Sequence, residues 1–311
     1  MKPISKILWA IDPYDEPSRF QVPLRMLKYL VEATHATIQP VFVVLATGDR
    51  SDSDLILERE QTSNLFKEIY LKGLLPPQVV QTTFNDPDEV VTRLLAYGAN
   101  TNADLVLANT HGWTGLSRVF RGSFVNRLLF QSTIPVMAVG PDVNEINPFD
   151  RILYATHLDS ISKQDFREAV EIAKLFHSEL TVLHLLSRRQ RDQGDQEGED
   201  STELGQSLPI RSKLMRRSLS WSNWASRQGV ATEVVLEDLS TQVTKQIRQA
   251  ASRHRVGLIL LESRSGLLAS FLRGSKVREI VQSAECPVWV HRLPKKGVLQ
   301  DSLLQPVKTV A

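Results

Sequence analysis

Residues 121–136 read RGSFVNRLLFQSTIPV, and residues 273–288 read RGSKVREIVQSAECPV. Both stretches hold a Gly-Ser pair, a segment with helical spacing of apolar residues and a closing Pro-Val, at the same separations. A second pair of similar stretches, KILWA at 6–10 and RILYA at 151–155, opens each half of the chain. Self-similarity of this kind indicates a repeated structural unit. The sequence therefore predicts one domain written twice.

Each half alternates short apolar runs, typical of buried strands, with segments of helical periodicity. In the first half the expected strands are 7–11, 41–45, 79–84, 104–108 and 136–139, and the expected helices are 17–34, 54–72, 86–98 and 124–130. In the second half the expected strands are 152–156, 180–186, 231–236, 256–261 and 287–291, with helices at 163–177 and 210–228, at 241–253 and after Gly274-Ser275. Strict alternation predicts parallel sheets covered by helices on both faces. We expect two tandem five-stranded, doubly wound α/β domains, flavodoxin-like or Rossmann-like.

Turn-forming residues between Pro141 and Pro148 mark the expected linker. We predict a first domain over 1–143, a second over 149–293 and a C-terminal tail over 294–311. Residues 188–206 are polar and nearly free of apolar side chains, so we expect a mobile loop there.

Composition excludes several classes of protein. The net charge of +2 over 311 residues is too small for a nucleic-acid-binding surface. No apolar run reaches the length of a membrane span, and no signal-peptide layout opens the chain, so we expect a cytoplasmic protein with no membrane partner. The single cysteine, Cys286, allows no disulfide and no cysteine-based metal site, and we expect it to be a buried packing residue.

A candidate ligand site follows from the ends of two strands. Open α/β sheets bind ligands beyond the carboxyl ends of their strands, where the strand order reverses. With a flavodoxin-like order that point lies between the first and fourth strands, which end at Asp12 and Asn109. A carboxylate there can accept hydrogen bonds from ribose hydroxyls or from an adenine amine.

The fourth strand leads through a glycine-containing loop, with His111 and Gly112, to Gly122-Ser123 at a helix start. Glycines allow the backbone to approach a ligand, and free N–H groups at a helix N-terminus suit phosphates. Two interpretations stay open: a phosphate site, or a turn followed by an N-cap. His111 either faces a phosphate or has no role. The chain has no P-loop, dinucleotide fingerprint, nucleophile elbow or HExxH pair, so no catalytic or metal-binding residue is predicted.

The chain resembles the universal stress protein family in its tandem form. ATP-binding members carry G-x2-G-x9-G-[ST] after the fourth strand, and this chain has Asn109, Gly112 and Gly122-Ser123 at those positions, with Asn109 in place of the first glycine. The resemblance implies an adenine nucleotide α-hydrolase-like fold and one ATP, with Mg²⁺, in the first domain. It also implies that Asp12 contacts the nucleoside and that the backbone of Val43 contacts adenine.

The second half departs from this pattern. His157 stands where Asp12 stands in the first half, and Leu261 and Arg264 occupy the first two glycine positions. We therefore expect a degenerate copy that packs on the first through its fifth strand, as an internal pseudo-dimer. Whether two such chains form a homodimer stays open.

Three functions are compatible with these features. The first is a stress-response module that binds ATP as a regulatory switch, with protein partners that the sequence does not identify. The second is a nucleotide-free interaction scaffold in which both sites have decayed. The third is a slow ATPase or phosphotransferase, for which the sequence offers no acid–base pair beyond Asp12 and His111.

Overall fold

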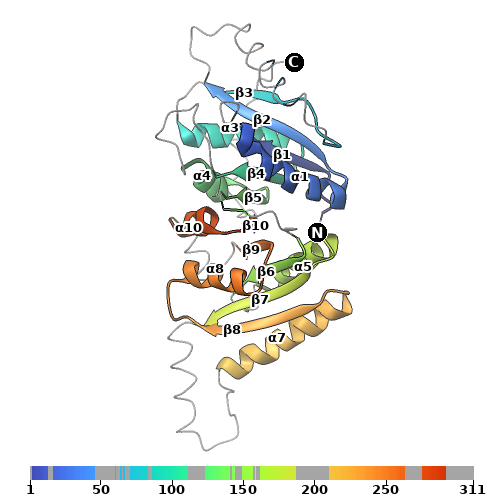
Figure 1. The fold of residues 1–311 in the computed structure, drawn as a ribbon, viewed down its shortest axis with the longest axis vertical. Coiled ribbons are helices and arrows are strands. Elements are labelled where there is room, and N and C mark those ends of the chain that lie inside the picture. The colour runs from blue at the N-terminus through green and yellow to red at the C-terminus, as the bar shows by residue number, and fades with distance from the viewer. Residues whose placement is uncertain are drawn as a thin grey trace, which may run out of the picture. The chain divides into compact units, whose positions relative to one another are not determined.

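The computed structural model describes most of both repeats, and the described residues are 2–12, 17–45, 60, 64, 66, 71–82, 86–110, 123–140, 142–143, 149–156, 158, 162–186, 210–262 and 275–291. The chain divides into two compact units (Figure 1). The N-terminal unit comprises residues 2–145 together with 272–311, and the middle unit comprises residues 146–271. The domain boundaries that the sequence predicts, at 143, 149 and 293, are not tested by this division and stay a prediction.

The sheet of the N-terminal unit has the order β3-β2-β1-β4-β5-β10. Its strands are β1 (Lys6–Ala10), β2 (Thr37–Leu45), β3 (Gln78–Thr82), β4 (Leu105–Asn109), β5 (Val136–Val139) and β10 (Val288–His291). The first five are parallel, as the alternating pattern predicts. The sixth, β10, comes from the second repeat and pairs antiparallel with β5, with Trp289 opposite Met137. Five strands of the first repeat thus form the sheet that sequence analysis expected, extended by one strand.

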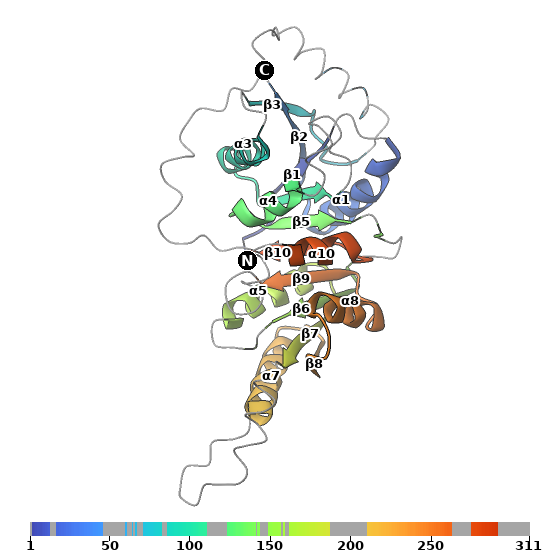
Figure 2. The ribbon, with the colours of Figure 1, turned by 90° about the vertical axis from the view of Figure 1, so that its left-hand side faces the viewer.

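Helices cover both faces of this sheet (Figure 2). They are α1 (Gln21–Thr34), preceded by the 3-10 turn η1 (Pro17–Phe20), α3 (Pro87–Asn100), α4 (Ser123–Gln131) and α10 (Ser275–Ser283). Asp86 is the N-cap of α3, because its Oδ1 accepts a hydrogen bond from Asp88 N at 3.0 Å, and Pro87 lies in the first turn. Most of the expected helix 54–72 lies outside the described residues.

Strand β2 begins earlier than the apolar run predicted. The run starts at Val41, whereas the strand starts at Thr37. The prediction missed the first four residues because Gln39, although polar, is buried within the strand. Gln39 Nε2 donates to the carbonyls of Pro76, at 2.7 Å, and Pro40, at 3.2 Å. A buried amide whose donors are satisfied is tolerated in a strand interior, and sequence periodicity does not reveal it.

Asp104 joins the starts of β1 and β4. Its Oδ2 accepts hydrogen bonds from Ser5 N (2.9 Å), Ser5 Oγ (2.7 Å) and Lys6 N (3.1 Å), and its Oδ1 lies 2.5 Å from Lys2 Nζ. Burial alone would raise the pKa of Asp104, but these donors outweigh it and hold the pKa below its usual value. The bonds fix the two central strands side by side, which positions their carboxyl ends.

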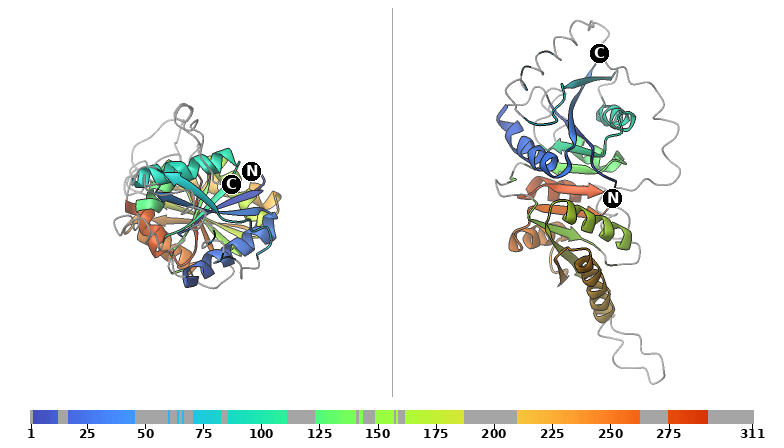
Figure 3. Two further views of the ribbon diagram at one scale, coloured as in Figure 1. Left: turned by 90° about the horizontal axis from the view of Figure 1, so that it is seen from above. Right: turned by 90° about the vertical axis from the view of Figure 1, so that its right-hand side faces the viewer.

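The middle unit contains a four-stranded parallel sheet in the order β9-β6-β7-β8. Its elements are β6 (Arg151–Ala155), α5 (Ser162–Leu175), β7 (Glu179–Leu186), α7 (Ile210–Arg227), β8 (Thr232–Asp238), α8 (Val243–Arg253) and β9 (Leu258–Glu262). Helices α5 and α8 lie on opposite faces of the sheet (Figure 3), and α7 joins α5 through a stack of Phe166 on Trp221, with ring centroids 4.6 Å apart.

The core of both units consists of the residues that the apolar runs predicted. Trp9 and Trp289 are buried in β1 and β10, and Trp221 is buried in α7. Cys286 is buried, as expected for a packing residue. Within the described ranges, no helix combines the length and the apolarity that a membrane span requires.

Candidate functional site

The reversal of strand order in the N-terminal unit lies between β1 and β4. Strand β1 pairs with β2 on one side and with β4 on the other, with Ala10 opposite both Val41 and Ala108. The chain leaves β1 toward β2 and later returns to the opposite side of β1 to form β4. The order β3-β2-β1-β4-β5 is Rossmann-like, so the expected flavodoxin-like order, 2-1-3-4-5, is wrong. The reversal nevertheless lies between β1 and β4, as predicted, and it places the candidate crevice at the carboxyl ends of these two strands.

Asp12 lies two residues beyond the end of β1. The ladder with β2 continues past the strand, because Ile11 N donates to Val41 O at 3.0 Å. Asp12 itself is only 6% exposed. The structure therefore holds this carboxylate at the predicted edge of the sheet, rather than on a loop that extends into solvent.

Asn109 is the last residue of β4 and lies opposite Val139 of β5. The hydrogen bonding to β5 continues for one residue beyond β4, since Thr110 N donates to Val139 O at 3.0 Å. Asn109 is 8% exposed, and its buried Oδ1 has no hydrogen-bond partner among the residues that the structure describes. A buried carbonyl oxygen that accepts no hydrogen bond costs roughly 1–3 kcal/mol, so this position favours a ligand group that donates one.

Val43 lies on β2 at the same edge. In a strand, residues two apart direct their backbone N–H and C=O groups toward the same neighbour. Val41 O faces β1, where it accepts from Ile11 N. The N–H and C=O of Val43 therefore face the side of β1 as well, but at a level where β1 has ended. This geometry leaves backbone groups of Val43 directed toward the side of β1 at a level beyond its end, next to the predicted ligand position.

The remaining predicted site residues are only partly covered by the structure. His111, Gly112 and Gly122 lie outside the described residues. Ser123 is the first residue of α4, which agrees with the predicted helix start. The structure thus brings Asp12 and Asn109 to adjacent strand ends and Val43 to the same edge, and it leaves the glycine loop as a prediction.

The corresponding edge of the middle unit differs in its side chains. His157, the counterpart of Asp12, and Arg264 lie outside the described residues, while Leu261 is buried at the end of β9. Leu158 is fully buried with a left-handed φ of 53°, and its N–H donates to Thr156 Oγ1 at 3.2 Å.

Two further contacts occupy polar groups at this edge. The carbonyl of Leu158 accepts from Arg217 Nη1 of α7 at 2.5 Å, and Thr156 O lies 2.9 Å from Nδ1 of the buried His184. Sequence analysis missed these contacts, because no local pattern links Leu158 to an arginine on another helix. A buried leucine and backbone groups bonded within the protein are a poor setting for a polar ligand.

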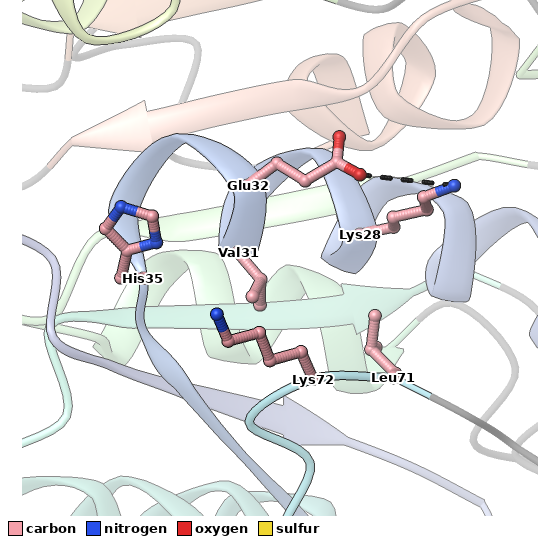
Figure 4. A pocket seen from close by; sticks show the side chains of 6 residues that line it. All are labelled: Lys28, Val31, Glu32, His35, Leu71 and Lys72. Atoms are coloured by element: carbon pink, nitrogen blue, oxygen red, sulfur yellow. Dashed lines mark ion pairs between the residues drawn. The ribbon is translucent and has the colours of Figure 1, made fainter.

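A separate cavity of about 330 Å³ lies near the amino ends of the strands of the N-terminal sheet (Figure 4). It lies between the end of α1 and the segment before β3, and it is lined by Lys28, Val31, Glu32, His35, Leu71 and Lys72. Lys28 and Glu32 form an exposed ion pair at 4.0 Å. Because β2 starts at Thr37, next to these residues, the cavity adjoins the amino ends of the strands and is not part of the crevice.

The described side chains include no grouping of three or more His, Cys, Asp or Glu residues placed to hold a metal ion. The groups that the structure places at the carboxyl ends of β1 and β4 are the carboxylate of Asp12, the carboxamide of Asn109 and the backbone groups of the strand ends. Such a set can bind the hydroxyl and amine donors of a small polar ligand.

The universal stress protein family model matches two segments of the chain, residues 3–140 and 148–292. A universal stress protein from Archaeoglobus fulgidus DSM 4304 is similar in structure, with a TM-score of 0.60 and 17% identity over 93% of this chain and 96% of that one. A functionally unknown protein from Pseudomonas aeruginosa PAO1 gives a TM-score of 0.59 and 15% identity over 93% and 92%. A putative universal stress protein from Pseudomonas aeruginosa UCBPP-PA14 gives 0.59 and 13% over 93% of both chains. No curated protein matches the sequence.

Proposed function

Because the chain belongs to the universal stress protein family, with two copies of the family domain, we propose that its first repeat binds one adenine nucleotide. We infer that the nucleotide is ATP, accompanied by Mg²⁺, and that the protein is a cytoplasmic regulatory module of the stress response rather than an enzyme. Bound nucleotide then serves as a signal that changes the affinity for a protein partner.

One observation carries the proposal: Asp12 and Asn109 end adjacent parallel strands at the reversal of strand order, and both are more than nine-tenths buried. Their oxygens are hydrogen-bond acceptors, and the nucleoside part of ATP offers the matching donors in its ribose hydroxyls and its exocyclic amine. The unpartnered Oδ1 of Asn109 supports this assignment, since it gains a donor when such a ligand binds.

The other parts of the site divide the ligand between them. The backbone of Val43 faces the crevice and suits the edge of adenine. The phosphates are assigned to the loop with His111, Gly112 and Gly122 and to the N-terminus of α4 at Ser123, where N–H groups and the helix dipole favour negative charge. Mg²⁺ would be held by the phosphates and would neutralise part of their charge.

The second repeat is assigned a different role. The closed edge around Leu158 and Thr156, and the motif positions taken by Leu261 and Arg264, support a copy that holds no nucleotide in the same manner. Its last strand, β10, contributes to the sheet of the N-terminal unit through β5. We propose that this repeat acts as the built-in packing partner of the first.

The nucleotide content of protein purified from cells tests the proposal. The test compares the unchanged protein with Gly122→Val in the first repeat and with Gly274→Val at the equivalent position of the second. We expect ATP in the extract of the unchanged protein and of Gly274→Val, and none in that of Gly122→Val, because a side chain at Gly122 blocks the backbone approach to phosphates.

Three results would contradict the proposal. An unchanged protein free of nucleotide would favour the scaffold alternative, and ADP in place of ATP would favour the slow ATPase. Loss of nucleotide from Gly274→Val alone would assign the site to the second repeat.

A further inference from the structure

Helix α7 has a one-sided charge composition. Its 18 residues include five cations and neither Asp nor Glu; the cations are Arg211, Lys213, Arg216, Arg217 and Arg227. An ordinary exposed helix mixes both signs, because pairs three or four residues apart then attract each other. The composition of α7 therefore indicates a surface that favours an anionic neighbour.

The inner side of α7 is fixed against the middle unit. Leu214, Ser218, Trp221 and Ala225 are buried and recur at helical spacing. Trp221 stacks on Phe166 of α5. The helix is therefore held in one orientation, and its opposite side is presented outward.

The outer face of α7, defined here by Lys213, Met215, Arg216, Leu219 and Arg227, combines charge with apolar area. Met215 is 46% exposed and Leu219 is 55% exposed, and they lie one turn apart. Only one other large apolar side chain in the described ranges, Phe130 of α4, is comparably exposed. Scattered exposed apolar residues need no explanation, but two adjacent ones amid cations form a small patch that a partner would cover.

Two of the five cations are already engaged within the middle unit. Arg211 lies 3.7 Å from Asp238, and Arg217 donates to the carbonyl of Leu158. Lys213, Arg216 and Arg227 form no ion pair with any residue that the structure describes. Among the described residues, the outer face therefore carries three cations without an ion-pair partner alongside the apolar pair.

Charge and shape select among the classes of partner. A second copy of the same face is disfavoured, since it would set three cations against three cations. A bilayer is disfavoured as well, because a helix that lies in a membrane needs a broad apolar face, and that of α7 is buried against its own domain. Arginine provides a planar fork that matches a carboxylate, and methionine and arginine are enriched in protein interfaces.

We propose that the outer face of α7 is a docking surface for an acidic protein segment. Carboxylates of the partner pair with Arg216 and Arg227, and apolar side chains of the partner pack on Met215 and Leu219. This surface belongs to the repeat that we assign no nucleotide, and the inference does not depend on nucleotide binding.

The test uses a fluorescent synthetic peptide that forms an amphipathic helix, with leucines along one side and glutamates elsewhere. A second peptide carries glutamine in place of each glutamate. Anisotropy titrations compare the full-length protein with Arg216→Ser/Arg227→Ser and with Met215→Ser/Leu219→Ser. The matched control is Lys245→Ser/Arg248→Ser, which removes two exposed cations from α8. All of the changed side chains are exposed, and thermal unfolding verifies that each variant is folded.

We expect the glutamate peptide to bind in a salt-sensitive manner, and each α7 variant to bind it at least about tenfold more weakly, while the α8 control binds as the unchanged protein does. Four results would overturn the inference. They are no binding of the glutamate peptide, equal losses in the α7 and α8 charge variants, equal affinity for the glutamine peptide, and α7-dependent uptake onto phosphatidylglycerol vesicles without peptide binding.

Discussion

Gly140 and Val281 lie so close together that a side chain on Gly140 has no room. A β-carbon built on Gly140 would be 2.5 Å from the carbonyl oxygen of Val281 and 3.5 Å from that of Ala284. Gly140 directly follows β5, and Val281 belongs to α10 of the second repeat. This glycine thus permits the approach of α10 to the end of β5, within the same unit in which β5 pairs with β10.

Gly140→Ala is therefore expected to destabilise the protein. Forcing a methyl group against a backbone carbonyl typically costs about 1–3 kcal/mol, because the helix must move away from the strand. Chemical denaturation monitored by tryptophan fluorescence measures the change. Gly229→Asn is the control, since Gly229 has no neighbour within 4 Å and a φ of +84°, which asparagine tolerates. Equal stability of Gly140→Ala and the unchanged protein would contradict the close approach.

Asp104→Asn is expected to lower the free energy of unfolding near neutral pH and to change how that free energy depends on pH. The pKa of Asp104 is lower in the folded protein than its ordinary value. A group of this kind contributes stability that is fully present above its unfolded pKa and is lost as the pH falls through its folded pKa. Hydrogen bonds to a charged group contribute about 1.5–3 kcal/mol each at most, and the exposed partner Lys2 adds little.

Urea denaturation at neutral pH and at a pH below 3.8, the ordinary value for this carboxyl, measures the effect of Asp104→Asn. We expect the variant to be less stable at neutral pH and the difference to shrink in acid. Glu171→Gln is the control. Glu171 Oε1 lies 3.2 Å from Lys174 Nζ, but both side chains are exposed, so the loss of this ion pair should change stability little. A difference that grows as the pH falls would contradict the account.

Asn109→Leu is expected to change stability and ligand affinity in opposite directions. The substitution removes a buried oxygen that has no hydrogen-bond partner, so the nucleotide-free protein should melt at a slightly higher temperature. The same oxygen is assigned to a nucleoside donor, so the affinity for ATP should fall about tenfold. Thermal melting without nucleotide and calorimetry with ATP provide the two readouts. Unchanged affinity would remove Asn109 from the site.

The parts of the fold that sequence predicted are those governed by local patterns. The strands of both repeats are apolar runs, and the cap at Asp86 has a local signature in the proline that follows it. The start of β2 was not predictable, because Gln39 is satisfied by Pro76, which lies 37 residues away in sequence. Packing of the two repeats through their fifth strands was expected from the family resemblance rather than from periodicity, and the antiparallel direction of the pairing of β5 with β10 was not predicted.

The candidate site follows the same division. Asp12 and Asn109 were found because each is a polar residue directly after an apolar run, and the carboxyl ends of parallel strands lie at one edge of the sheet. The unpartnered oxygen of Asn109 depends on packing from several elements, and no sequence pattern reports it. The bond between Leu158 and Arg217 spans 59 residues and was likewise out of reach.

Isothermal titration calorimetry of the intact protein with ATP and Mg²⁺ tests the central claim most directly, because the stoichiometry distinguishes the two repeats. The account predicts one ATP bound per chain, with the heat lost in Gly122→Val and kept in Gly274→Val. Two ATP per chain would show that the second repeat, despite His157 and Arg264, has kept its site. No heat of binding in the intact protein would contradict the assignment of a nucleotide to the crevice between β1 and β4.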